Sequence, residues 1–156
     1  MLAKSDAYKE PRIYALDRVL DLKQTKTSFK LPKEFEPKEV FRKLFGVILD
    51  NGPVEEVVIR VSEDQVKYYR TLPLHHSQKE GESGDGYTEF SYRLVPTFDF
   101  VRELLSKGMY VEVMSPLWLR KEIAQEMRQA LSMYEDVLED VPYFSEEDEY
   151  MFFEED

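Results

Sequence analysis

The chain of 156 residues lacks several features on which common functions depend. It has no cysteine, which excludes disulfides, thiolate metal sites and cysteine nucleophiles. Its two histidines, His75 and His76, are adjacent. Neighbouring side chains on a strand point to opposite faces, so we expect this pair not to share a metal ion. There is also no long apolar run and no N-terminal apolar segment. We therefore expect a cytoplasmic protein without a membrane partner.

Motifs that carry catalysis are also missing. No Gly-x-Ser-x-Gly nucleophile turn occurs. The glycine-rich stretch 81–86 lacks the Gly-Lys-Ser/Thr ending of a phosphate-binding loop and lies between two expected strands. We therefore expect no enzymatic activity and no cofactor.

The charge is distributed unevenly. The chain has 32 acidic and 21 basic residues, and eleven of the acids lie in residues 131–156, which contain no Lys or Arg. The remaining 32 − 11 = 21 acids balance the 21 bases, so the body is neutral. We expect residues 135–156 to form a disordered acidic tail. Because aromatic residues are interleaved with these acids, a sharper hypothesis is that the tail mimics nucleic acid and occupies a basic groove.

The clearest periodicity lies between residues 54 and 134. Apolar residues alternate with polar ones in several short segments and recur at helical spacing in others. The pattern predicts strands at 54–61, 74–81, 87–95 and 109–114, and helices at 62–71, 98–107 and 116–134. This order indicates an α+β fold, a ferredoxin-like β-α-β-β-α-β domain with an extra C-terminal helix.

The segment before this domain is less regular. Residues 1–3 are typical of a strand end, residues 4–10 of a hairpin loop, and residues 11–16 and 19–22 of extended chain. A short helix is expected from Pro37 to Gly46. A lone hairpin is only marginally stable in water, so we expect another segment or chain to pair with it.

Several motifs resemble one family of bacterial regulators. Arg12-Ile13-Tyr14-Ala15-Leu16-Asp17-Arg18 resembles the R-x-[FY]-x-x-D-R segment that ends the WYL domain, an Sm-like barrel. The following sequence resembles the C-terminal extension of those proteins, the WCX domain. The resemblance rests on Phe35 with Leu44-Phe45-Gly46-Val47, on His76-Ser77-Gln78, and on Gly108 to Pro116 with Leu119 and Arg120. It divides the chain into the last strands of a truncated WYL domain (1–30), a WCX domain (31–134) and the acidic tail (135–156).

The resemblance implies a role in transcription regulation. In this family a helix-turn-helix head binds DNA, and the WYL and WCX domains sense an effector, in several cases single-stranded nucleic acid. The head and most of the WYL barrel would be missing upstream partners, and the full-length protein is expected to be a homodimer. By analogy Arg12, Tyr14 and Arg18 would contact an anionic effector, and Asp17 would orient Arg18.

The residues themselves leave alternatives open for these positions. Arg12 and Arg18 are an even number of positions apart, so an unbroken strand would present both guanidinium groups on one face. Guanidinium groups can hold phosphate bidentately. The alternative is that they pair with Glu10, Asp17 or Asp21 and only fix the hairpin.

Four further candidates lie within the predicted domain. Arg60 and Arg93 are expected on the open face of the sheet, where they either support a nucleic-acid backbone or form cross-strand ion pairs such as Arg93 with Glu112. His76 and Gln78 either contact the ligand or satisfy local hydrogen bonds.

Two other classes of function compete with the sensor. The first is a structural or dimerisation module without a ligand, because unpaired strand edges seek partners. The second is an RNA-binding domain of the RRM type. It is disfavoured because the third strand lacks the RRM signature and its aromatic residues, Phe90 and Tyr92, are expected to face the helices.

Overall fold

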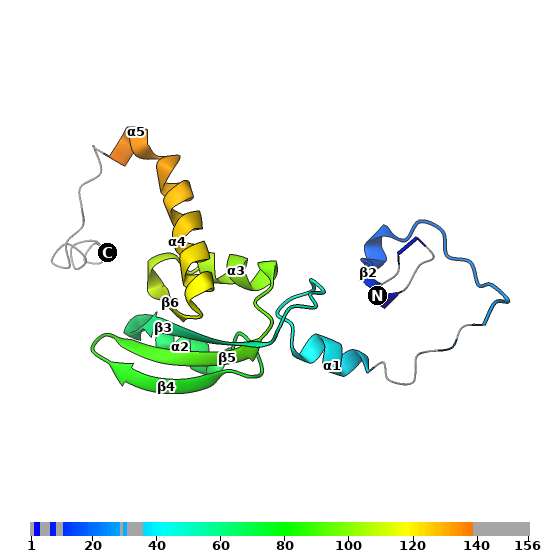
Figure 1. Cartoon of the computed structure of the whole chain (residues 1–156), viewed down its shortest axis with the longest axis horizontal. Helices are drawn as coiled ribbons and strands as arrows, with labels where there is room; N and C mark the ends of the chain where they lie inside the picture. Colours follow the sequence, from blue (N-terminus) through cyan, green and yellow to red (C-terminus); the bar gives the residue numbers. More distant parts are fainter. Residues whose placement is uncertain (1, 4–6, 9–10, 29, 31–35, 139–156) are drawn as a thin grey trace, which may run out of the picture. The chain divides into compact units, whose positions relative to one another are not determined.

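The computed structural model describes residues 2–3, 7–8, 11–28, 30 and 36–138 (Figure 1). The chain forms two compact units, residues 1–123 and residues 124–156. Residues 139–156, most of the expected acidic tail, lie outside the described part, and the first residues of that tail form a short helix, α5 (Glu135–Leu138). None of the described helices combines the length and the apolar character needed to cross a membrane.

The centre of the first unit is a four-stranded antiparallel sheet (Figure 1). Its strands are β3 (Glu55–Ser62), β4 (Lys79–Gly84), β5 (Tyr87–Leu94) and β6 (Val111–Ser115), in the spatial order β4-β5-β3-β6. Helix α2 (Glu63–Thr71) follows β3, and α3 (Phe98–Leu105) precedes β6. This order and connectivity are those of the ferredoxin-like pattern, so the predicted fold class is confirmed.

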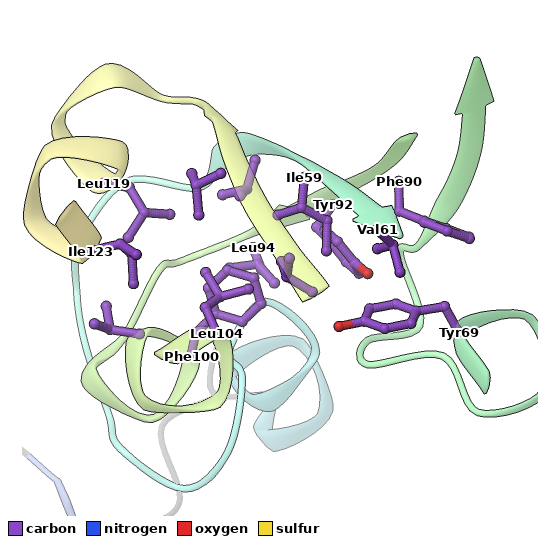
Figure 2. Packing of buried hydrophobic residues seen from close by; sticks show 14 of the residues in the cluster. Ile59, Val61, Tyr69, Phe90, Tyr92, Leu94, Phe100, Leu104, Leu119 and Ile123 are labelled. Atoms are coloured by element: carbon purple, nitrogen blue, oxygen red, sulfur yellow. The ribbon is translucent and has the colours of Figure 1, made fainter. Parts of the chain in front are cut away.

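One face of the sheet is apolar and covered. Val57 pairs with Tyr92, and Ile59 pairs with both Phe90 and Val113, so period-two alternation places these side chains on the same face. All of them are buried, as was expected for Phe90 and Tyr92. Figure 2 shows Ile59, Phe90 and Tyr92 packing with residues of the helices. The helix residues in this core are Val66, Tyr69, Phe100, Val101, Leu104, Leu119 and Ile123.

Two predicted strands begin later than expected. The strand expected at 74–81 begins at Lys79, because residues 74–78 form a turn held by the side chain of Gln78. The backbone N–H of Gln78 also donates to the carbonyl of His75 at 3.0 Å. Residues 108–110, partly assigned to the last strand, form a 3-10 turn (Gly108–Tyr110), and Met109 is exposed.

The helix boundaries agree more closely with the sequence. Helix α2 lies within the predicted range 62–71, and Ser62 is its N-cap. The hydroxyl of Ser62 donates to Asp64 Oδ1 at 2.6 Å and makes no capping bond to the backbone. Helix α4 (Leu117–Ser132) buries Leu119 and Ile123. Further along its predicted apolar face, residues such as Leu131 are exposed.

The N-terminal segment forms a smaller hairpin than expected. Strands β1 (Leu2–Ala3) and β2 (Arg12–Ile13) pair antiparallel over two residues each. Of the extended segments expected at 11–16 and 19–22, only Arg12–Ile13 form a strand, and Leu16–Arg18 form a 3-10 turn. Helix α1 (Pro37–Arg42) begins at Pro37 as predicted and ends before the expected stop at Gly46. Residues 31–35, including Phe35 of the family motif, lie outside the described part of the chain.

Candidate functional site

A cleft of about 1440 Å³ brings three of the predicted effector residues together. Arg12, Tyr14 and Arg18 line it from the N-terminal hairpin, and residues 47–49 and Asn51 line it from the loop after α1. We call it the hairpin cleft. Its cationic side chains come from the segment that carries the WYL-like motif.

The two arginines of the hairpin cleft differ in their surroundings. The guanidinium of Arg12 lies 3.4 Å from the ring centroid of Tyr8, which is a cation–π contact. Arg18 ends the 3-10 turn and is exposed. Neither forms an ion pair with any residue that the structure describes. Asp21, one of the partners considered, instead pairs with Lys23 at 2.8 Å. Glu10, another partner considered, lies outside the described residues, and no described carboxylate pairs with either guanidinium group.

Asp17 lies beside the cleft without a visible link to Arg18. It is exposed within the same 3-10 turn, and no ion pair joins the two side chains in the described part of the chain. The 3-10 turn also breaks the even spacing on which the shared strand face of the two arginines was predicted. The arginines reach one cleft through the turn, not through a common strand.

The loop that forms the other wall is fastened to the sheet domain. We call residues 43–51 the strap. Its carbonyls at Lys43 and Phe45 accept hydrogen bonds from the backbone N–H of Val95 at 2.8 Å and from the hydroxyl of Thr97 at 3.0 Å. The ring of Phe45 packs edge-on against Phe100, 5.2 Å between centroids.

A single carboxylate completes the attachment of the strap. Asp99 Oδ2 accepts from the backbone N–H of Val47 at 2.9 Å and of Ile48 at 3.2 Å. Gly46 makes this turn possible, because its φ of +73° favours glycine. A Cβ at Gly46 would also lie only 2.3 Å from Asp99 Oδ2. The Phe45-Gly46-Val47 motif therefore forms a tight turn that is hydrogen-bonded to Asp99 of α3.

Sequence reasoning missed Asp99 and the strap as parts of the site. The Leu44-Phe45-Gly46-Val47 motif indicated that the strap matters, but nothing in the sequence links the strap to Asp99, about fifty positions later. Only the fold brings the first turn of α3 to the strap.

Arg60 and Arg93 lie away from the hairpin cleft, on the open face of the sheet. Arg60 donates from Nε to Glu89 Oε1 at 3.0 Å and lies 4.4 Å above the ring of Tyr87. The hydrogen bond to Glu89 raises the pKa of Arg60. Arg93 is exposed and pairs in register with Glu56.

The ion pair considered for Arg93 is not formed. Its expected partner, Glu112, instead accepts from Arg120 Nη2 at 2.6 Å. On the open face, Arg60 therefore forms a cross-strand ion pair, which was the alternative to binding a nucleic-acid backbone. Arg93 is an exposed cation on the same face.

His76 and Gln78 lie in the turn before β4. Gln78 uses its amide internally: Oε1 accepts from the hydroxyl of Tyr92 at 3.0 Å, and Nε2 donates to the carbonyl of Tyr69 at 2.7 Å. The exposed ring of His76 lies 4.1 Å from that of the buried His75. This turn is not a strand, so the argument that strand geometry separates the two histidines is wrong.

The histidine pair nevertheless has a structural role in this turn. His75 Nε2 lies 3.1 Å from the carbonyl oxygen of Arg42, and Nδ1 lies 2.7 Å from the hydroxyl of Ser77. Burial, together with the neighbouring His76, lowers the pKa of His75. Among the described residues, no group of three or more potential metal ligands occurs.

The sheet domain and the hairpin cleft together indicate the class of the protein. The chain contains a ferredoxin-like α+β domain and a cleft lined by arginines of the N-terminal segment. The chain belongs to the WCX domain family, whose model matches residues 53–131, half of the chain. This match confirms the identification of the WCX extension of WYL-type regulators that the motifs indicated.

No curated protein shows significant similarity to the chain. A solved structure, the proteasome accessory factor B/C of Arthrobacter aurescens, is similar with 19% sequence identity and a TM-score of 0.43. That similarity covers 77% of this chain but only 17% of the other protein.

Proposed function

We propose that the chain is an effector-sensing module of a WYL-type transcriptional regulator and binds an anionic ligand in the hairpin cleft. The observation that carries this proposal is the presence of Arg12 and Arg18 in one cleft without an ion pair to any described residue. Membership of the WCX family supports the regulatory context. In this proposal a DNA-binding head belongs to the longer regulator.

Single-stranded nucleic acid is the ligand class that fits the cleft best. Guanidinium groups hold phosphates bidentately, and an aromatic side chain offers a face on which a base can stack. Arg12 and Arg18 provide the first element, and Tyr14 in the same cleft provides the second. The cleft volume of about 1440 Å³ accommodates several nucleotides. Asp17, Arg60, His76, Gln78 and Arg93 remain predicted contacts outside this proposal.

Fluorescence anisotropy with short, labelled single-stranded DNA and RNA oligomers tests the proposal. We expect binding that weakens with salt, and a salt slope reduced by about 0.7 for each phosphate contact removed by Arg12→Ala or Arg18→Ala. Arg128→Ala is the matched control, because it removes an exposed arginine that does not line the cleft and is not a predicted contact. Equal loss in all three variants would indicate non-specific attraction, and no binding of any oligomer would refute the nucleic-acid ligand.

A dimerisation module without a ligand is the second candidate. Several apolar side chains of the second unit are exposed, among them Leu131 at 53%, Met133 at 76% and Tyr134 at 60%. Contiguous exposed apolar groups are typical of interaction surfaces. Sedimentation velocity distinguishes the candidates: a dimer that Leu131→Glu dissociates, together with absence of oligomer binding, would favour this one.

A further inference from the structure

The two walls of the hairpin cleft differ in what holds them. In the arginine wall, Arg12 lies in β2 and Arg18 ends the 3-10 turn after it, and β2 pairs with β1 over only two residues. The opposite wall is the strap. Four hydrogen bonds between the strap and residues 95–99, together with one aromatic contact, attach it to the sheet domain. A ligand held by the arginines therefore meets a surface whose position is fixed by the WCX domain.

Within the strap, the cleft-lining residues depend on Asp99. Val47 and Ile48 both line the cleft, and both donate their backbone N–H to Asp99 Oδ2. The other attachments of the strap act on the carbonyls of Lys43 and Phe45, which do not line the cleft. Asp99 is thus the described side chain of the sheet domain that directly holds the backbone of the cleft wall.

We propose that Asp99 is a positioning residue of the hairpin cleft. It sets the backbone of Val47 and Ile48 at the distance from Arg12 and Arg18 that the ligand requires, and it links occupancy of the cleft to helix α3. This inference rests on the proposed function, since it concerns the same cleft. It adds a residue that touches no ligand and that the motif resemblance did not indicate.

The charge of Asp99 is compatible with an anionic ligand nearby. One of its oxygens accepts two backbone N–H groups, which is the kind of contact that satisfies a carboxylate without a cation. Its position in the first turn of α3 also places the charge at the favourable, positive end of the helix. Both contacts of this carboxylate therefore come from the chain itself and involve no cation.

The test compares Asp99→Ala with Asp99→Asn in the full chain, using the labelled oligomers described above. Asparagine keeps an oxygen that accepts from both N–H groups, so we expect affinity within about threefold of the wild type. Alanine removes both bonds, and we expect affinity to fall about tenfold. Val101→Ala is the control for lost stability, because Val101 is buried on the same helix and does not line the cleft.

Hydrogen exchange of two amides provides a readout that a purely structural role would not produce. The oligomer should slow exchange at Val47 and Ile48 in the wild type, and should fail to do so in Asp99→Ala at concentrations that saturate that variant. The Val101→Ala protein should behave as the wild type. All measurements are made where circular dichroism shows each variant to be folded.

The outcomes separate this inference from the proposed function. If Arg12→Ala and Arg18→Ala weaken binding while Asp99→Ala does not, the positioning role is refuted and the sensor proposal stands. If Val101→Ala weakens binding as much as Asp99→Ala, the effect comes from general stability and the positioning role is again refuted. If no oligomer binds, both fall together.

Discussion

Substituting Gly46 by alanine should destabilise the chain more than any other glycine-to-alanine change at a positive φ. Three described glycines have positive φ: Gly46 at +73°, Gly86 at +76° and Gly108 at +55°. All three pay the left-handed backbone cost when a Cβ is added. Only at Gly46 does the new Cβ also meet a neighbour, Asp99, whose Oδ2, Cβ and Cγ would lie at 2.3, 2.7 and 2.8 Å.

The expected magnitude follows from three contributions. The left-handed conformation costs a non-glycine residue roughly 1–2 kcal/mol, and alanine recovers about 0.4–1 kcal/mol by reducing the entropy of the unfolded chain. These two alone give about 1 kcal/mol. At Gly46 the carboxylate must also move away and release Val47 and Ile48, and two partly exposed hydrogen bonds contribute about 1–3 kcal/mol together. We therefore expect about 2–4 kcal/mol for Gly46→Ala.

Urea unfolding followed by tryptophan fluorescence measures this difference. The single tryptophan, Trp118, donates to Glu55 Oε2 at 2.9 Å and so reports on packing between α4 and β3. Gly108→Ala is the matched control, since nothing lies within 4 Å of its added Cβ. A free energy of unfolding reduced equally by Gly46→Ala and Gly108→Ala would refute the proposed conflict between a side chain at position 46 and Asp99.

Three further predictions concern the buried polar groups. Tyr92→Phe should lower the free energy of unfolding by about 1 kcal/mol, because the Tyr92 hydroxyl donates to Gln78. Tyr69→Phe should leave it unchanged or raise it, because the buried Tyr69 hydroxyl has no hydrogen-bond partner among the described residues. Chemical denaturation of the two variants measures both effects. Burial, with the charge of Glu103, raises the pKa of Tyr69 from 10.0 to about 12. Unfolded tyrosine ionises first, so stability should fall as pH rises from 10 towards 12, less steeply in Tyr69→Phe. The pKa of His75 is lowered from 6.5 in the folded state, so the unfolded state binds a proton more tightly there. The free energy of unfolding should therefore fall as pH drops below 6.5. A denaturation series from pH 7 to 5 should show a flatter profile for His75→Gln.

The sheet domain was predictable because its signals are local. Alternation in residues 54–61 and 87–95 fixes both the strands and the face that each side chain occupies, and burial of Val57, Ile59, Phe90 and Tyr92 agrees with it. The errors lie where a side chain overrides the pattern. Residues 74–78 contain strand-like apolar spacing, but the amide of Gln78 folds them into a turn by bonding Leu74 and Tyr69.

The candidate site was predictable only in part, for a different physical reason. Arg12, Tyr14 and Arg18 come from one short motif, so sequence alone could group them. The partners across the cleft are set by long-range contacts. The Asp99 bonds to the strap span 51 and 52 positions, and no periodicity or spacing in a single sequence encodes such a pair.

The unequal construction of the cleft has a consequence for how a signal would pass. A two-residue ladder such as β1–β2 contributes little stability by itself, so binding energy at Arg12 and Arg18 has to order the hairpin as well as hold the ligand. The strap opposite already has its conformation fixed by Gly46 and Asp99. Under the proposed function, a ligand that bridges both walls would therefore order the hairpin against the strap, whose own conformation Asp99 holds.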